Sequence, residues 1–266
     1  MKPDRDIFGR VSKDKPDWSH RRGEPRWFAL AWTMFVLATT LTAIFSAGTP
    51  DLGSRLAYAE ASKHLMVVLG VGVGLLWPMI RLSQASPAGG LRGSCGAALR
   101  DVVIVLTPLV AVILPHFLLA RWPVPVVLAV ACSFAAWTLL VGAMLAIAIR
   151  ERGARSFGAS VSWMLAFVAL VAGVPAVVGL VVAVQPAAIS VRSSASIEWW
   201  WLGSPATSAV EMVRPRAWTG ASTAVVGGHW VGIAVVASCA VALWIGAIAA
   251  GHANGAAVVA EASESA

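Results

Sequence analysis

Three histidines are the residues of this sequence that could bind a metal ion or haem. His64, His116 and His229 lie at the ends of three separate apolar stretches. Imidazole nitrogens at one depth in a membrane can bind copper or zinc, and a single imidazole can ligate haem. Membrane haem usually relies on paired histidines within helices, however, and no such pair occurs here. We therefore expect these histidines to hydrogen-bond lipid headgroups and backbone carbonyls, and we expect no metal and no cofactor.

The motifs of common enzyme mechanisms are absent from the sequence. No lysine follows the glycine pattern of a phosphate-binding P-loop, and H-E-x-x-H, G-x-S-x-G and paired carboxylates are also missing. The cysteines Cys95, Cys132 and Cys239 form no C-x-x-C pair, so neither a disulfide framework nor a zinc knuckle is expected. These absences predict a protein that is not an enzyme.

The composition indicates a membrane protein. Hydrophobic residues make up 58% of the chain and charged residues only 12%, which is too few to cover a soluble surface. The net charge of +7 comes mainly from cations beside apolar stretches, where they set topology and contact lipid headgroups. We therefore expect the lipid bilayer as a partner and no nucleic acid. The bias toward arginine and alanine suggests a bacterial source.

The apolar stretches predict an all-α, polytopic membrane protein with six transmembrane helices. The expected spans are residues 27–46, 65–81, 101–120, 122–149, 157–184 and 229–250. The rest of the chain is expected to form a charged N-terminal segment (1–26), an outer loop (185–228) and a tail (251–266). No Asp, Glu, Lys or Arg lies in the middle of any expected span, which disfavours an ion-coupled transporter.

Cations after the fourth span predict the orientation of the bundle. Arg150, Arg152 and Arg155 follow this span within a short stretch, and such a cluster stays in the cytoplasm. Arg92 and Arg100, in the loop between the second and third spans, then lie on the same side. The expected location is the bacterial cytoplasmic (inner) membrane, with both termini in the cytoplasm.

Small residues predict where helices pack closely. Gly70 and Gly74 form a G-x-x-x-G pattern in the second span, and Gly173 lies among small residues of the fifth span. These positions support helix packing and carry no chemistry of their own.

A short outer interfacial helix is expected before the last span. Trp199, Trp200 and Trp201 suit the membrane interface, where an indole buries its ring and keeps its N–H hydrated. Ser204 is placed as an N-cap and Pro205 as the first helical residue. The helix is expected to lie on the outer leaflet or to dip into it.

This layout resembles the permease subunits of ABC exporters. The local similarities are Leu202-Gly203-Ser204-Pro205 before the last span, Trp77-Pro78 near the end of the second, and Ala97-Ala98-Leu99-Arg100 entering the third. The resemblance implies a dimeric pore, an ATPase partner on the loops 82–100 and 150–155, and export of a hydrophobic or lipid-like solute. The loop 82–100 lacks the acidic stretch usual in that family. A partner should therefore present an acidic groove to the arginines.

An alternative function remains open from the sequence. This alternative is a non-catalytic anchor or structural subunit of a larger respiratory or photosynthetic membrane complex. In either case we expect a homo- or hetero-oligomer. A neighbouring ATPase gene favours the first function, whereas co-purified haem or pigment favours the second.

Overall fold

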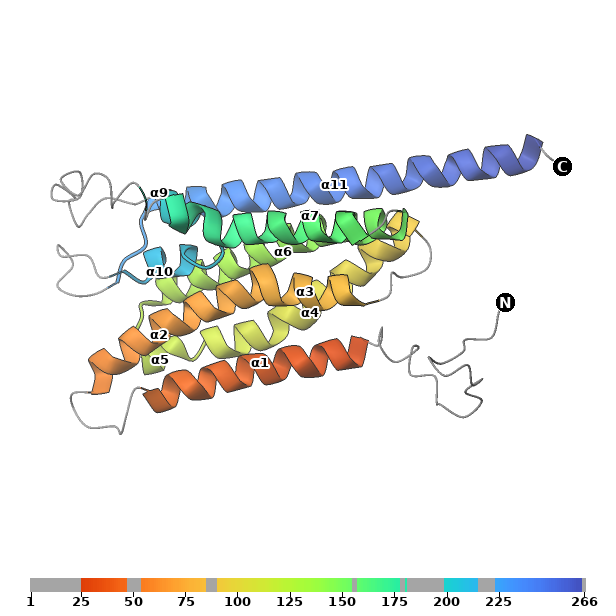
Figure 1. Cartoon of the computed structure of the whole chain (residues 1–266). Coiled ribbons are helices and arrows are strands. Elements are labelled where there is room, and N and C mark those ends of the chain that lie inside the picture. Colours follow the sequence, from red (N-terminus) through yellow and green to blue (C-terminus); the bar gives the residue numbers. More distant parts are fainter. Residues whose placement is uncertain are drawn as a thin grey trace, which may run out of the picture.

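The computed structural model describes residues 25–46, 54–84, 90–154, 157–177, 180, 199–214 and 223–264. These residues contain no β-strand, and six helical stretches are long and apolar enough to cross a membrane. The predicted all-α polytopic fold is therefore confirmed. The six stretches run side by side, and α1 (Pro25–Ser46) begins at the end of the bundle where α11 (Gly227–Glu264) terminates (Figure 1).

The two ends of the bundle differ in their side chains. We call the end where α1 begins the arginine end, and the opposite end the tryptophan end. The arginine end carries Arg81, Arg92, Arg100 and Arg150, whereas the tryptophan end carries Trp122 and Trp199–Trp201. Neither name refers to a side of the membrane.

The second span is a composite of three helical elements. It consists of α2 (Ser54–Val71), the π-helix η2 (Gly72–Leu76) and α3 (Trp77–Ser83). The helix begins eleven residues before the predicted start at residue 65 (65 − 54 = 11). Alanine, leucine, glutamate and lysine dominate this early part and are strong helix formers, so the helix continues past the apolar stretch.

The third span differs from its predicted bounds at both ends. Helix α4 (Gly90–Ile113) begins within the expected loop, eleven residues before the predicted start at residue 101 (101 − 90 = 11), and Pro108 lies inside it. The chain breaks at Leu114–Pro115 and resumes as the four-residue α5 (His116–Leu119). Arg121 then adopts a positive φ of 52°, which turns the chain into α6 (Val124–Ala154).

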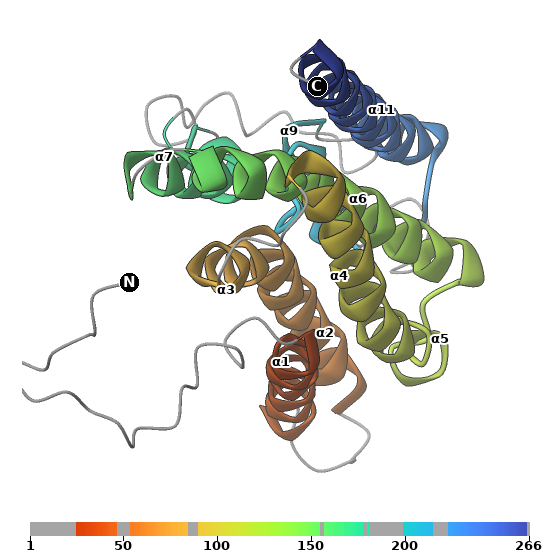
Figure 2. The same cartoon turned by 90° about the vertical axis from the view of Figure 1, so that its right-hand side faces the viewer.

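Helix α6 occupies the centre of the bundle. It packs along both α4 and α11, and it also contacts α7 (Phe157–Val168) and the second span (Figure 2). A Cβ added at Gly142 would lie 2.7 Å from Cγ2 of Val102, so this glycine permits the close approach of α4. On the other side, Nε1 of Trp244 donates a 3.0 Å hydrogen bond to the carbonyl oxygen of Leu139.

Burial differs strongly between the six spans. Over half of the apolar stretch is buried in the second and fourth spans, at 61% and 56%. The first and last spans are each only 17% buried, and the fifth is 11% buried. Three apolar helices therefore expose most of their surface at the margin of the bundle, as expected for lipid-facing or subunit-facing helices.

The fifth span also contains a π-helix. Helix α7 continues as η3 (Ala169–Gly173) and remains helical to Val177, whereas its predicted end at residue 184 lies outside the described residues. Two short helices follow, α9 (Trp199–Leu202) and α10 (Ser208–Met212). Helix α11 then extends beyond the predicted span end at residue 250.

Candidate functional site

The chain between α9 and α10 folds back into the bundle at the tryptophan end. We call residues 199–213 the re-entrant segment. Trp199 and Trp200 lie at its rim and are 52% and 68% exposed. Farther along, Ser204, Ala209 and Val213 are all at most 1% exposed. Trp199 and Trp200 therefore reach the surface, while most of residues 202–213 are buried.

The local conformation differs from the predicted single helix. Residues 203–207 form turns, and the helix begins at Ser208 instead of Pro205. The Ser204 hydroxyl does accept a hydrogen bond from the N–H of Ala206 (3.3 Å), in the manner of a cap. The hydroxyl of Thr207 donates back to the carbonyl oxygen of Trp201 at 2.7 Å. These internal bonds give hydrogen-bond partners to polar groups of the turn. Non-helical backbone inside a membrane needs such partners, because lipid supplies none.

One wall of the re-entrant segment is the π-helix of the fifth span. The Ser204 hydroxyl donates a 2.7 Å hydrogen bond to the backbone carbonyl of Val171, in the middle of η3. Ser204 is fully buried, so the bond is shielded from water. π-helical turns are uncommon and occur frequently at functional sites.

The opposite wall is the second span, next to its own π-helix. A Cβ added at Gly70 would lie 2.2 Å from the carbonyl oxygen of Pro205 and 2.7 Å from Cα of Ala206. A Cβ at Gly74 would lie 2.2 Å from Cγ2 of Val171. The two glycines of the predicted G-x-x-x-G pattern therefore accommodate the backbone of the re-entrant segment and the side chain of Val171.

Helices α6 and α11 close the remaining side. The hydroxyl of Ser133 on α6 donates to the hydroxyl of Ser208 at 3.2 Å. The gap between α6, α11 and the re-entrant segment is too narrow for a water molecule. The segment is therefore closely packed against α6 and α11.

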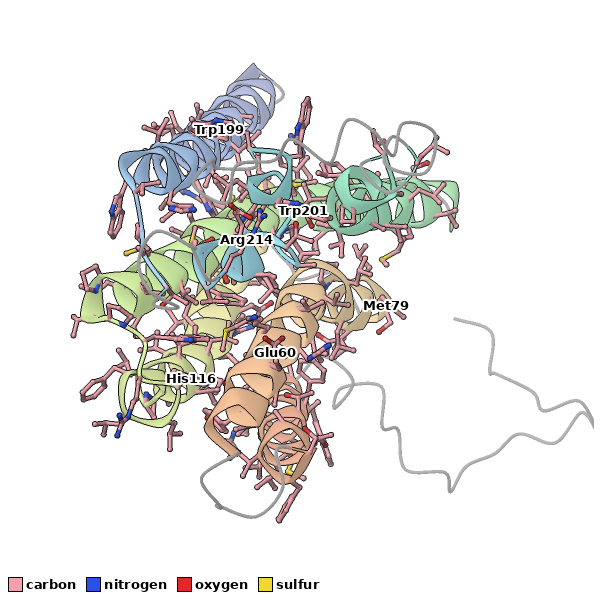
Figure 3. The ribbon with its side chains drawn as sticks, turned by 90° about the vertical axis from the view of Figure 1, so that its left-hand side faces the viewer. Glu60, Met79, His116, Trp199, Trp201 and Arg214 are labelled. Atoms are coloured by element: carbon pink, nitrogen blue, oxygen red, sulfur yellow. The ribbon has the colours of Figure 1, made fainter. Side chains whose placement is uncertain are left out.

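A charged pair lies where the re-entrant segment ends. Glu211 is 2% exposed, and its Oε2 lies 3.5 Å from the guanidinium of Arg214. Figure 3 shows Arg214 and Trp201 near each other over the middle of the bundle, with Trp199 beside α11. A buried carboxylate is stable only where charged or hydrogen-bonding groups compensate it, so this corner is polar within an apolar protein.

A second buried ion pair joins the second and third spans near the arginine end. Nε of Arg81 lies 2.5 Å from Oδ2 of Asp101, and both side chains are at most 5% exposed. The same guanidinium also donates to Oε1 of Gln84 at 2.5 Å. The pair connects the two ends of the loop between these spans. Arg81 lies on α3, which directly follows η2, and Asp101 lies on α4.

Three of the predicted partner-contact arginines, Arg92, Arg100 and Arg150, lie at the arginine end and are exposed. Arg155 and the side chain of Arg152 lie outside the described residues. The beginning of α4 is held firmly by a buried cluster with α6 and α11. This cluster consists of Leu91, Cys95, Ala98, Ala143, Ala146, Trp244 and Ala247.

The three histidines have separate local roles. His64 and His116 each donate from Nδ1 to the carbonyl oxygen four residues earlier, at 3.0 and 2.8 Å. Nδ1 of His229 instead accepts from the N–H of Val226 at 3.1 Å. The ring of His116 stacks on Trp122 with centroids 5.1 Å apart. Within the described ranges, no three His, Cys, Asp or Glu side chains are placed to hold a metal ion.

Several residues of this site were not identified from the sequence. Val171, Ser208 and Glu211 contribute through contacts between distant segments, which no local pattern reveals. The Arg81–Asp101 pair had a weak signal in the sequence, since Arg81 closes one apolar stretch and Asp101 opens the next. At Gly173, no described atom comes within 4 Å of an added Cβ, so this position does not pack closely here.

No family model, curated protein or solved structure matches this chain.

Proposed function

We propose that this chain is the membrane-spanning subunit of an ATP-driven exporter that moves a hydrophobic or lipid-like solute with a separate ATPase partner. The proposed setting is a bacterial inner membrane, with both termini in the cytoplasm and the chain in a homo- or hetero-oligomer. The observation that carries the proposal is the re-entrant segment seated between η2 and η3. A six-span bundle closed at one end by such a segment suits a gated passage better than a passive anchor.

The two π-helices support movement at that seat. A π-turn carries one residue more than a regular helical turn, so its hydrogen bonds can rearrange with a small shift of the helix. Both π-helices contact each other as well as the re-entrant segment. A small rotation of the second or fifth span would therefore release or clamp Ser204 and Pro205.

The arginine end supports docking of an acidic partner. Arg92 and Arg100 project from the part of α4 that packs against α6 and α11. Because this part is rigidly packed, a partner pushing on it would move the helices rather than only a loop. The Arg81–Asp101 pair would pass the displacement to α3 and thus to η2.

The proposed solute class follows from the apolar interior. No Asp, Glu, Lys or Arg lies in the middle of any expected span, so the bundle offers no charge to compensate a charged solute crossing at that depth. The absence of a P-loop assigns the energy source to a separate subunit.

Affinity purification of the tagged, gently solubilised protein from its own membrane tests the proposal. We expect an ATPase among the recovered subunits, and we expect the variant R92E/R150E to lose it. The matched control is Arg26→Glu, which changes an exposed arginine on α1 at the same end of the bundle. Recovery of a haem- or pigment-bearing complex without an ATPase would replace this proposal with the anchoring function.

A further inference from the structure

A groove runs between α1 and α2 in the half of the bundle near the tryptophan end. Its volume is about 390 Å³, within the range of small-ligand sites, and it opens at the margin of the bundle. Ala38 and Ala61 belong to its walls and leave room between the two helices, while Leu65 and Val68 make its deeper part apolar. The groove is separate from the re-entrant segment, since the described residues that line it come only from α1 and α2.

The hydroxyl groups that line the groove already donate their hydrogens to backbone carbonyl oxygens. The hydroxyl of Thr39 donates to the carbonyl oxygen of Phe35 at 2.9 Å, and that of Thr42 donates to Ala38 at 2.8 Å. Ser46 donates to the carbonyl oxygen of Ala43 at 2.9 Å. A hydroxyl group has one hydrogen and two lone pairs, so each of these oxygens offers only lone pairs to a ligand.

His64 adds an acceptor from the opposite wall. Its Nδ1 lies 3.0 Å from the carbonyl oxygen of Glu60, which can only accept, so Nδ1 carries the hydrogen. In the neutral imidazole the other nitrogen, Nε2, is then an acceptor. No Asp, Glu, Lys or Arg is among the described residues that line the groove, and nearby Lys63 is paired with Glu60 at 2.6 Å.

The spacing of the acceptors fits one polar group at the end of an apolar chain. Thr39, Thr42 and Ser46 are three and four residues apart, and therefore share one face of α1. A primary ammonium group has three hydrogens to donate, whereas a hydroxyl group has one and a carboxylate has none. Hydrogen bonds from a charged donor are also the stronger ones.

We propose that this groove binds a long-chain primary amine, with its ammonium group donating to Thr42, Ser46 and His64 and its alkyl chain lying along Leu65 and Val68. The polar end then lies near the ends of both spans, where water and headgroups are close, and the chain points toward the middle of the membrane. Binding of the amine requires neither transport nor an ATPase. The inference therefore stands apart from the proposed function.

Photolabelling of the purified full chain in lipid nanodiscs tests this site. The probe is a dodecylamine that carries a photoreactive diazirine in its chain, and the labelled peptides are mapped by mass spectrometry. We expect labelling of residues 38–46 and 61–68. Unlabelled dodecylamine should compete best, dodecanol and dodecyltrimethylammonium more weakly, and dodecanoate least. Equal competition by dodecanoate would overturn the assignment of donors and acceptors.

Two substitutions locate the site. Thr42→Val keeps the shape of the side chain but removes the oxygen, and we expect it to weaken binding about tenfold, as for loss of one charged hydrogen bond. Ala61→Leu should fill the groove and abolish labelling. The control Thr107→Val alters an exposed threonine on α4 that bonds its own helix in the same way, at 2.8 Å. Unchanged binding by the Thr42 variant, or a second copy of the chain cross-linked across this groove, would contradict the proposal.

Discussion

The hydroxyl of Ser204 donates a 2.7 Å hydrogen bond to the carbonyl oxygen of Val171, thirty-three residues earlier in the chain. This bond attaches the re-entrant segment to the π-helix of the fifth span. Both residues are buried, so neither group has water as an alternative partner. This hydrogen bond between the two segments therefore depends on the Ser204 side chain.

We expect Ser204→Ala to loosen the re-entrant segment. The variant leaves a buried carbonyl without its donor, which costs about 1–3 kcal/mol. Hydrogen–deuterium exchange should rise across residues 199–213, and the thermal midpoint of the purified protein should fall. Ser162→Ala is the control, because Ser162 bonds Gly158 at 3.1 Å on the exposed face of α7. Equal behaviour of the two variants would show that the Ser204 bond is not structural.

We expect Gly70→Ala to displace the re-entrant segment. The added methyl group would lie 2.2 Å from the carbonyl oxygen of Pro205, and this neighbour is backbone that cannot rotate away. Overpacking of this kind typically costs about 1–3 kcal/mol. Thermal unfolding in detergent measures the effect. Gly96→Ala on α4 meets no atom within 4 Å and should be neutral or slightly stabilising.

The stability of the protein should depend strongly on both members of the buried pair of Arg81 and Asp101. Replacing either residue alone by a neutral one leaves a buried charge, at a cost of about 3–5 kcal/mol. The double variant R81M/D101L removes both charges and should recover most of the stability and the yield of folded protein. The exposed pair of Lys63 and Glu60 serves as a comparison, with an expected effect below about 1 kcal/mol. A double variant as unstable as the single variants would show that their loss of stability does not come from an unpaired charge.

The orientation of the bundle can be measured by labelling with a membrane-impermeant maleimide. Cys95, Cys132 and Cys239 are first replaced by alanine, and single cysteines are then introduced at Arg92 and Trp200, which are both exposed. We expect Trp200→Cys to react in intact cells and Arg92→Cys only in broken cells. The reverse pattern would place the arginine end outside.

Sequence patterns were sufficient for the architecture because a membrane-spanning helix needs only a long uncharged stretch. The predicted number of six long apolar helices is confirmed, and the uncharged stretch at residues 122–149 lies in the central helix α6. The helix starts were harder to predict, because Ser54 to Lys63 forms helix by propensity without being apolar.

The contacts inside the site could not be predicted from the sequence, because they join segments that are far apart in the chain. The π-helices η2 and η3 have ordinary apolar sequences, and their widened turns coincide with contacts to distant segments. Interface and capping preferences drew attention to the tryptophans, Ser204 and Pro205, which lie together in the re-entrant segment. Their burial depends on Gly70 and Val171, which only the folded chain brings next to them.

The pair of Arg81 and Asp101 also constrains how the chain is made. Arg81 leaves the ribosome twenty residues before Asp101, so a second span released alone into lipid would carry an unpaired cation. The third span would carry an unpaired anion in the same way. Insertion of the two spans together as a helical hairpin neutralises both charges before either meets the lipid. Biosynthesis of this protein should therefore proceed with the second span retained at the insertion machinery until the third arrives.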